Sequence, residues 1–292
     1  MPDAAASRAR GFLVCVVAYA SALLAAWLVT RLMPLASPLV VAAAADGVAT
    51  LVVFAWSRAF DNSSLYDPYW SVAPVALVLY WIWAEPQGDD WRKAAVPILV
   101  SIWAVRLTYN WARRWRGLGH EDWRYVDIRH RTGRWYWPVS LLGIHLMPTV
   151  AVFLGCLPAH AAVTVPLRNP GPLDLIATLV TVGGIWIEAS ADERLFRFSR
   201  DRQDRAGLLE TGLWRWSRHP NYFGEVLFWW GLGLFGMAAA PERWAMLLGP
   251  VAVTCLFLFV SIPMMDRHLA ASRPSSAERQ RRLSRLIPWF PP

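Results

Sequence analysis

Cysteine is scarce in this sequence, with three in 292 residues. Cys15, Cys156 and Cys255 all fall within apolar segments at unrelated positions, so they form neither the spacing of a metal site nor a disulfide framework. We interpret them as small apolar side chains that fill space. The sequence therefore argues against a zinc module and a disulfide-stapled secreted domain, and we expect no metal site.

Lysine is almost absent, because Lys93 is the only one among 29 basic residues. A net charge of +8 is compatible with nucleic-acid binding, but here the arginines lie in short loops beside apolar segments. Anionic lipid headgroups and membrane topology explain arginine in such loops. We therefore expect membrane lipids, and no nucleic acid, as partners.

Long polar stretches are missing as well. The chain is 56% hydrophobic, contains 19 tryptophans and has a mean hydropathy of +0.31, which is too apolar for a soluble domain. Apolar runs long enough to span a bilayer recur along it. We predict an all-α integral membrane protein, a multi-span helical bundle of about eight transmembrane helices. The expected spans are 11–33, 38–60, 69–85, 95–112, 136–158, 172–190, 222–240 and 243–263, of which the third and the seventh are short.

The distribution of arginine predicts the topology. With eight spans, both termini and most basic residues lie on one side, which the positive-inside rule makes cytoplasmic. With seven spans, the basic residues would not be separated in this way between the two sides of the membrane. The first span follows Arg8 and Arg10 and is interpreted as a retained signal anchor. The opposite side keeps Arg31, Arg92, Lys93, Arg168 and Arg243.

The segment Gly212–Glu225 places polar groups at the start of the apolar segment Val226–Ala240. Polar groups at a membrane edge are costly unless they bind something polar. Pro220 suits the first turn of a helix, whose free N–H groups attract an anion. The segment therefore predicts a helix that opens onto a phosphorylated ligand, and a basic membrane-edge anchor explains it equally well. Its polar members include Arg215, Arg218, His219, Asn221, Tyr222 and Glu225.

The stretch Gly231–Gly236 matches the G-x-G-x-x-G pattern of dinucleotide-binding proteins. That function needs a preceding strand. This match lies inside an apolar span, where small residues allow helices to pack closely. We predict a packing role for these glycines.

Asp67 and a charged loop are candidates for chemistry at the ends of the spans. Asp67 precedes Pro68 and is either a helix N-cap or a carboxyl group whose pKa is raised by a low-dielectric pocket, so that it donates to a carbonyl. The loop around Glu121–Tyr125, with arginines on both sides, is either a lid over a phosphate-bearing ligand or a surface for lipid headgroups.

Other ionisable residues also lie within the spans or at their ends, among them Arg106, Glu188, Asp192, Asp46 and His145. Glu188 and Asp192 are four residues apart and share a helix face, where ribose hydroxyls, a metal or arginines would separate their charges. The lack of His or Cys nearby favours sugar or arginine over metal. Asp46 and His145 lie deeper and are either functional or paired with a helix neighbour.

Six motifs occur in an order that we recognise: Asp67-x-x-Trp70, Arg106-Leu107, Glu121–Tyr125, Glu188–Asp192, Gly212–Glu225 and Ile287-Pro288-Trp289. With them the sequence resembles the steroid 5-alpha-reductase superfamily of membrane reductases, in its bacterial branch. The block that ends at Glu225 is the most specific part. The resemblance implies an additional N-terminal helix in residues 1–37 and a seven-helix reductase-like domain in residues 38–292, in a bacterial inner membrane.

The resemblance also implies a reaction, the NADPH-dependent reduction of a carbon–carbon double bond conjugated to a carbonyl in a lipidic substrate of sterol, enoyl or prenyl type. In such reductases a Glu and a Tyr polarise the carbonyl. They fall on Asp67 and Trp103, and Trp103 offers an indole N–H in place of a phenol. Asp67, kept protonated by burial, would stabilise the enolate. The implied cofactor contacts are Arg106, Glu188, Asp192, Leu195, Asn221, Phe223 and Glu225, and we add Arg218, His219 and Tyr222 for the phosphates.

Two other functions remain as alternatives. Isoprenylcysteine-type membrane methyltransferases share an Arg-His-Pro-x-Tyr block and use S-adenosylmethionine. They usually carry a paired Glu after the last span, where this chain has Met265-Asp266-Arg267. A non-catalytic lipid-binding or assembly protein would bind neither cofactor.

Overall fold

Every regular element in the described part of the chain is helical. The computed structural model describes residues 2–166, 169–200, 207–272 and 276–289. Within these ranges there is no strand, and one isolated bridge joins Ser217 to Ser284. The predicted all-α class is therefore confirmed. The chain forms two compact units, which we call unit 1 (Met1–Gly88 and Val100–Cys156) and unit 2 (Asp89–Leu99 and Leu157–Pro292).

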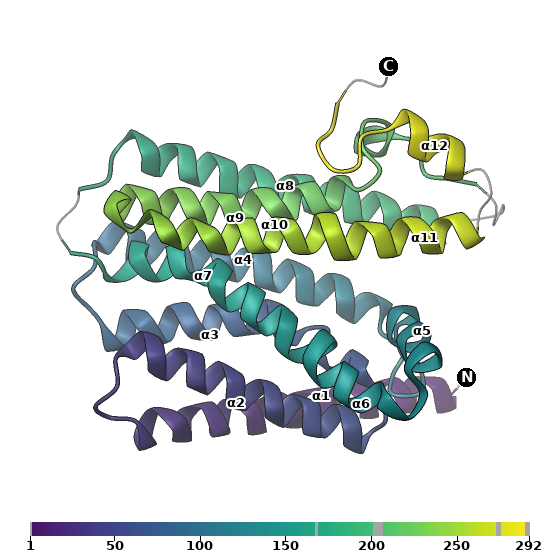
Figure 1. Ribbon diagram of the computed structural model, residues 1–292, viewed down its shortest axis with the longest axis horizontal. Coiled ribbons are helices and arrows are strands. Elements are labelled where there is room, and N and C mark those ends of the chain that lie inside the picture. Colours follow the sequence, from purple (N-terminus) through teal and green to yellow (C-terminus); the bar gives the residue numbers. More distant parts are fainter. Residues whose placement is uncertain (1, 167–168, 201–206, 273–275, 290–292) are drawn as a thin grey trace. The chain divides into compact units, whose positions relative to one another are not determined.

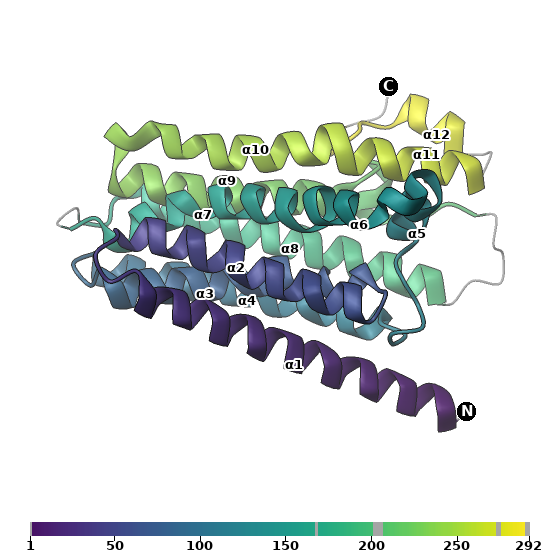
Figure 2. The ribbon, with the colours of Figure 1, turned by 60° about the horizontal axis from the view of Figure 1, so that its bottom comes forward.

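Unit 1 begins with two long helices, α1 and α2, that lie side by side (Figures 1 and 2). Ser37 caps α2 by accepting a hydrogen bond from Val40 N, and Pro38 occupies the first turn. The elements of this unit are α1 (Pro2–Leu32), α2 (Pro38–Ala59), η1 (Ser63–Tyr66), α3 (Tyr69–Ala84), the later part of α4 (Asp90–Arg114), α5 (Trp123–Thr132), η2 (Gly133–Trp135), α6 (Tyr136–Val139), the π-helical η3 (Ser140–Leu146) and the first part of α7 (Met147–Thr164).

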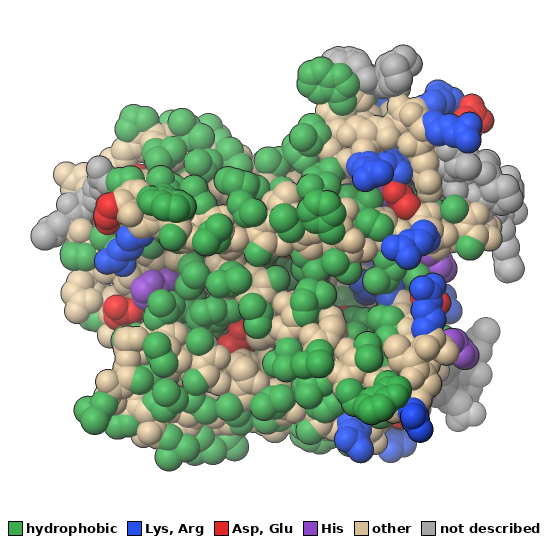
Figure 3. All heavy atoms as spheres, in the orientation of Figure 1, with side chains coloured by type: hydrophobic (Ala, Val, Ile, Leu, Met, Phe, Trp, Pro, Cys, Tyr) green, Lys and Arg blue, Asp and Glu red, His purple; other side chains and the backbone are tan. Residues whose placement is uncertain are grey.

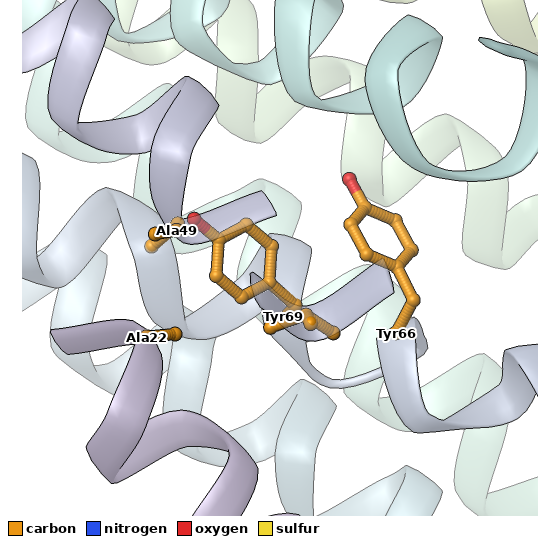
Figure 4. Packing of buried hydrophobic residues seen from close by; sticks show 6 residues of the cluster. Ala22, Ala49, Tyr66 and Tyr69 are labelled. Atoms are coloured by element: carbon orange, nitrogen blue, oxygen red, sulfur yellow. The ribbon is translucent and has the colours of Figure 1, made fainter. Parts of the chain in front are cut away.

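The core of unit 1 combines aromatic rings with small residues. The rings of Tyr66 and Tyr69 lie 5.4 Å apart, next to Ala22 of α1 and Ala49 of α2 (Figure 4). The alanines leave room for the rings between the helices. The Tyr66 hydroxyl bonds to Thr149 Oγ1 at 2.8 Å, so that its buried oxygen has a partner.

Unit 2 is built on α8 and α9, which pack backbone against backbone. A Cβ atom on Gly224 would lie 2.6 Å from Gly184 O, and one on Gly231 would lie 2.1 Å from Thr181 Oγ1. Only glycine allows this approach, so the predicted packing role of the glycines in α9 is confirmed. The elements of this unit are α8 (Pro172–Arg200), η4 (Gly212–Arg215), α9 (Pro220–Ala239), η5 (Pro241–Leu247), α10 (Leu248–Leu256), the π-helical η6 (Phe257–Ser261), α11 (Ile262–Ser272) and α12 (Ser276–Arg282), together with the end of α7 and the start of α4.

Five helical stretches in the described ranges are long and apolar enough to cross a membrane, as expected of an integral membrane protein. Hydrophobic side chains cover the visible flanks of the helices, and basic side chains gather near α11 and α12 (Figure 3). Helices α3, α4 and α9 fall on three other predicted spans but lack the length or the apolar character for this assignment, so the predicted number of eight is not established. The predicted span 136–158 belongs to a longer helical stretch. The five are Ser7–Leu32, Pro38–Ala59, Trp123–Thr164, Pro172–Arg200 and Pro241–Ser272.

Candidate functional site

Asp67 follows η1 and is bonded to a tyrosine of α5. Its Oδ1 accepts a hydrogen bond from Tyr125 Oη at 2.5 Å. Helix α3 begins at Tyr69 with Pro68 as its cap residue, so the alternative of Asp67 as the N-cap is wrong. Burial raises the pKa of Asp67 to about 7, although the charge of Arg124 opposes this shift. Asp67 is therefore a carboxyl group that exchanges its proton near neutral pH.

The loop before α5 brings Tyr125 to Asp67 because it is bonded to η1. Ser63 N donates to Glu121 Oε1 at 2.7 Å, and Asp122 N donates to Ser64 Oγ at 2.8 Å. Asp122 is also the N-cap of α5, so the position of this helix is set by its first residues. These bonds fix the phenol against the end of η1.

Tyr125 is the residue that the sequence interpretation missed. The motif Glu121–Tyr125 predicted a lid or a headgroup surface, and not a partner for Asp67. The predicted partner, Trp103, is fully buried, and its ring lies 6.1 Å from that of Trp70 in an edge arrangement. Arg106, three residues further along α4, is partly buried. The phenol that is bonded to Asp67 therefore comes from α5.

The predicted cofactor residues of α8 and α9 come together within unit 2. Asn221 Nδ2 donates to Asp192 Oδ1 at 3.2 Å. Glu188 and Asp192 are both buried, with 4% and 6% of their surface exposed, one turn apart on α8. Leu195 packs against a buried cluster that contains Trp214. Carboxylate and amide groups therefore lie beside the first turn of α9.

The first turn of α9 carries the remaining members of the motif. The Tyr222 ring stacks on the His219 ring at 5.2 Å between centroids. Glu225 is 1% exposed and accepts a hydrogen bond from Trp229 Nε1, one turn further along, at 2.8 Å. Phe223 is partly buried. His219 is the N-cap of α9 but makes no side-chain cap bond, so no side chain of the cap residue occupies the helix N–H groups.

Asp266 of α11 bonds two residues of the motif, and the sequence interpretation did not assign it a role. It accepts from Arg218 Nη1 at 2.7 Å and lies 3.0 Å from His219 Nε2. Burial lowers the pKa of His219, although its bond with Asp266 acts in the opposite direction. The imidazole is therefore neutral at pH 7 and donates from Nε2. Arg218 is 6% exposed, and its Nε has no hydrogen-bond partner among the described residues.

The C-terminal tail, residues 279–289, lies along the loop that precedes α9. Ser217 Oγ donates to Leu286 O at 2.8 Å, and Arg218 N donates to Ser284 O at 3.0 Å. The sequence motif Ile287-Pro288-Trp289 lies in this tail. In the structure, the backbone of the tail bonds to residues 216–218 of the loop before α9. We call residues 216–219 the Arg218 loop.

The two deep ionisable residues are paired with neighbours. Asp46 accepts from Tyr69 Oη at 2.8 Å. His145 is fully buried, with Nε2 3.2 Å from Ser57 Oγ and Nδ1 3.0 Å from Ser140 O. Both arrangements agree with the alternative that Asp46 and His145 are paired with neighbouring residues.

Known proteins similar to this chain give the family but no activity. The chain is 27% identical over 213 residues to a Schizosaccharomyces pombe protein described as uncharacterized. The aligned region covers 65% of this chain and 61% of that protein. The chain thus spans about three fifths of the length of this relative. No solved structure matches the chain. Residues 53–282, which include Asp67, Tyr125 and the Arg218 loop, match the family described as "Protein of unknown function (DUF1295)", and the chain belongs to this family.

Proposed function

We propose that the protein is an integral membrane reductase that uses NADPH to reduce a carbon–carbon double bond conjugated to a carbonyl in a lipidic molecule. The observation that carries the proposal is the Asp67–Tyr125 pair, in which a carboxyl group with a pKa of about 7 is bonded at 2.5 Å to a phenol. Hydride addition to such a substrate places negative charge on the carbonyl oxygen. Hydrogen-bond donors held at that oxygen stabilise the charge.

The pair supplies such a donor when Asp67 is protonated. Tyr125 donates to Oδ1 of Asp67. The acid proton of Asp67 then resides on Oδ2, from which it bonds a carbonyl oxygen of the substrate. As hydride adds to the β carbon, the π electrons move toward this oxygen and the hydrogen bond strengthens. A proton from water then adds at the α carbon and completes the reduction.

The residues of unit 2 fit a nicotinamide nucleotide. The buried Arg218 Nε has no partner in the described ranges, and a guanidinium with a free donor suits a phosphate. The N–H groups at the start of α9 favour the same charge. Asp192 offers carboxylate oxygen to ribose hydroxyls. The residues of unit 2 that we assign to the cofactor are Glu188, Asp192, Leu195, Arg218, His219, Asn221, Tyr222, Phe223 and Glu225. Arg106 of unit 1 is assigned to it from the sequence motif, and bound NADPH would supply the hydride.

The proposal includes eight membrane spans with both termini in the cytoplasm. Besides the five long apolar stretches, α3, α4 and α9 fall on the three remaining apolar runs of the sequence. The asymmetry of arginine between alternate loops supports this orientation. A sterol, enoyl or prenyl lipid would then enter from the bilayer.

Binding of cofactors to the full chain in detergent tests the proposal. NADPH and S-adenosylmethionine are titrated by calorimetry into the wild type and the Glu225→Ala variant. We expect NADPH to bind and the variant to bind it more weakly. Turnover is then followed by NADPH absorbance with a panel of conjugated lipid ketones.

Binding of S-adenosylmethionine alone would replace the reductase by a methyltransferase. A folded protein that binds neither cofactor would be a lipid-binding or assembly protein. Thermal unfolding of both variants is the control that separates lost binding from lost folding.

A further inference from the structure

Two arginines meet where the C-terminal tail crosses the loop before α9. Arg279 Nη2 donates to Trp214 O at 3.0 Å and lies 3.4 Å from Ser217 O. Ser217 is the neighbour of Arg218, whose backbone N–H is bonded to Ser284 O. The guanidinium of Arg279 is therefore held beside Arg218 by two backbone carbonyls, and it also lies over the Trp214 ring, 5.9 Å from the ring centroid.

Both guanidinium groups retain buried donor capacity. Arg218 is 6% and Arg279 is 8% exposed. The Nε atom of each is buried and, among the residues described, lacks a hydrogen-bond partner. Buried donors are almost always satisfied, so each Nε requires a partner beyond the described protein atoms, either a water molecule or an anion. A purely structural role for Arg279 would use its bonds to the loop carbonyls and would leave both Nε atoms unexplained.

The charge balance at this junction is positive. Burial lowers the pKa of Arg218, the charge of Asp266 opposes this shift, and the charge of Arg285 adds to it. Burial and the charge of Arg218 lower the pKa of Arg279. The Asp266 carboxylate is bonded to Arg218, and it is also hydrogen-bonded to His219 Nε2. The negative charge of Glu210, an exposed residue, raises the pKa of Arg279. Guanidinium groups remain charged when buried, so this junction attracts an anion with more than one negative charge.

We infer that Arg218 and Arg279 bind a phosphate monoester, a dianion whose oxygens match the guanidinium fork. Two sources have this chemistry, the 2′-phosphate of NADPH and the headgroup of phosphatidic acid. The first source rests on the proposed function, and the second does not. With the first source, the C-terminal tail determines the preference of the protein for NADPH over NADH, which lacks the 2′-phosphate.

Calorimetry on the full chain in detergent, with Arg279→Gln, tests this site. NADPH, NADH, short-chain phosphatidic acid and short-chain phosphatidylcholine are titrated separately. We expect the variant to bind NADPH at least tenfold more weakly and NADH within twofold of the wild type. Arg282→Gln is the matched control, because Arg282 lies on the same helix, is exposed and pairs only weakly with Glu278, at 3.6 Å.

The other outcomes separate the sources from each other and from a failure of the site. A selective loss of phosphatidic acid binding, with NADPH unchanged, keeps the site and assigns it to lipid. If the wild type binds no nucleotide, the proposed reductase fails, while the phosphatidic acid titration still tests the arginines.

Equal weakening of NADPH and NADH, without any loss of phosphatidic acid, would overturn the inference and leave Arg279 as a structural clamp. Arg285→Gln provides a second variant in case Arg279→Gln does not fold, because Arg285 is exposed and its charge acts on Arg218. We expect it to weaken the same phosphate ligand about threefold, and no change would count against the site.

Discussion

Unit 1 contains two Asp–Tyr pairs that place the same chemical groups in different surroundings. Asp46 accepts from Tyr69 Oη at 2.8 Å, and Asp67 accepts from Tyr125 Oη at 2.5 Å. Tyr69 Oη also lies 3.2 Å from the backbone oxygen of Asp46, and Asp46 is 6% exposed within the helix α2. Asp67 is only partly buried and lies between two elements, beside a charged loop. The carboxyl group of the first pair bonds within the hydrophobic core, whereas that of the second also lies beside the hydroxyl of Ser64 and the charges of Arg124 and Asp122.

The largest effect is expected from removing the carboxyl group of each pair. Asp67→Asn should lower kcat at least ~100-fold, because an amide N–H is a much weaker donor to the negatively charged enolate oxygen than a carboxylic acid is. NADPH affinity should stay within a few-fold. Asp46→Asn is the matched control, and its kcat should stay close to that of the wild type. Similar losses of kcat in the two variants would erase the distinction between the pairs.

A smaller effect is expected from removing each phenol. Tyr125→Phe should lower kcat about tenfold, because the hydrogen bond that orients Asp67 is lost. Tyr69→Phe should leave kcat nearly unchanged and lower the free energy of unfolding by about 1–3 kcal/mol, since a buried Asp46 loses its donor. Steady-state kinetics and denaturant unfolding of both variants measure the two effects. An unstable Tyr125→Phe protein with normal kcat would assign this phenol to the framework.

The pH dependence of turnover should distinguish the pairs more finely. Because Asp67 must be protonated, kcat should be constant below its pKa of about 7 and fall up to tenfold per pH unit above it. Asp46→Asn should keep this profile. Residual turnover in Asp67→Asn should lack the decline, and a wild-type profile that is flat from pH 6 to pH 9 would contradict the role of Asp67.

The smallest expected effect is on stability. The pKa of Asp67 is raised from 3.8 to about 7, so the folded protein binds this proton more tightly than the unfolded chain does. The stabilisation is fully present below about pH 4 and is lost as the pH rises to about 7. The melting temperature of the wild type should therefore fall by a few degrees more than that of Asp67→Asn over this interval. If the melting temperatures of the two proteins change equally with pH, burial does not raise the pKa of Asp67.

Hydropathy and local signals predicted most of the helical framework. The start of α9 at Pro220 and the glycines within α9 behave as expected, because helix capping and close packing depend on a few adjacent residues. The apolar runs also predicted the long helices correctly. The number of spans was less predictable, since α3, α4 and α9 combine apolar character with short length or charge.

The contacts of the candidate site were much less predictable. Tyr125 and Asp67 are 58 residues apart, and their distance depends on bonds between the loop and η1. Asp266 and Arg218 are 48 residues apart and meet only because α11 returns to the start of α9. A single sequence contains no local signal for such pairs. It identified Asp67 and Arg218 as candidates but could not identify their partners.

The crossing of the C-terminal tail over the Arg218 loop has a consequence for the order of synthesis. Ser217 leaves the ribosome 69 residues before Leu286, the residue whose carbonyl it bonds. At typical elongation rates this interval is roughly 3–14 s. During that time α8 and α9 can already pack through their glycines. The loop before α9 does not yet have its bonds to the C-terminal tail. Nascent chains stalled before residue 279 should therefore be inserted in the membrane and sensitive to proteolysis within residues 207–219.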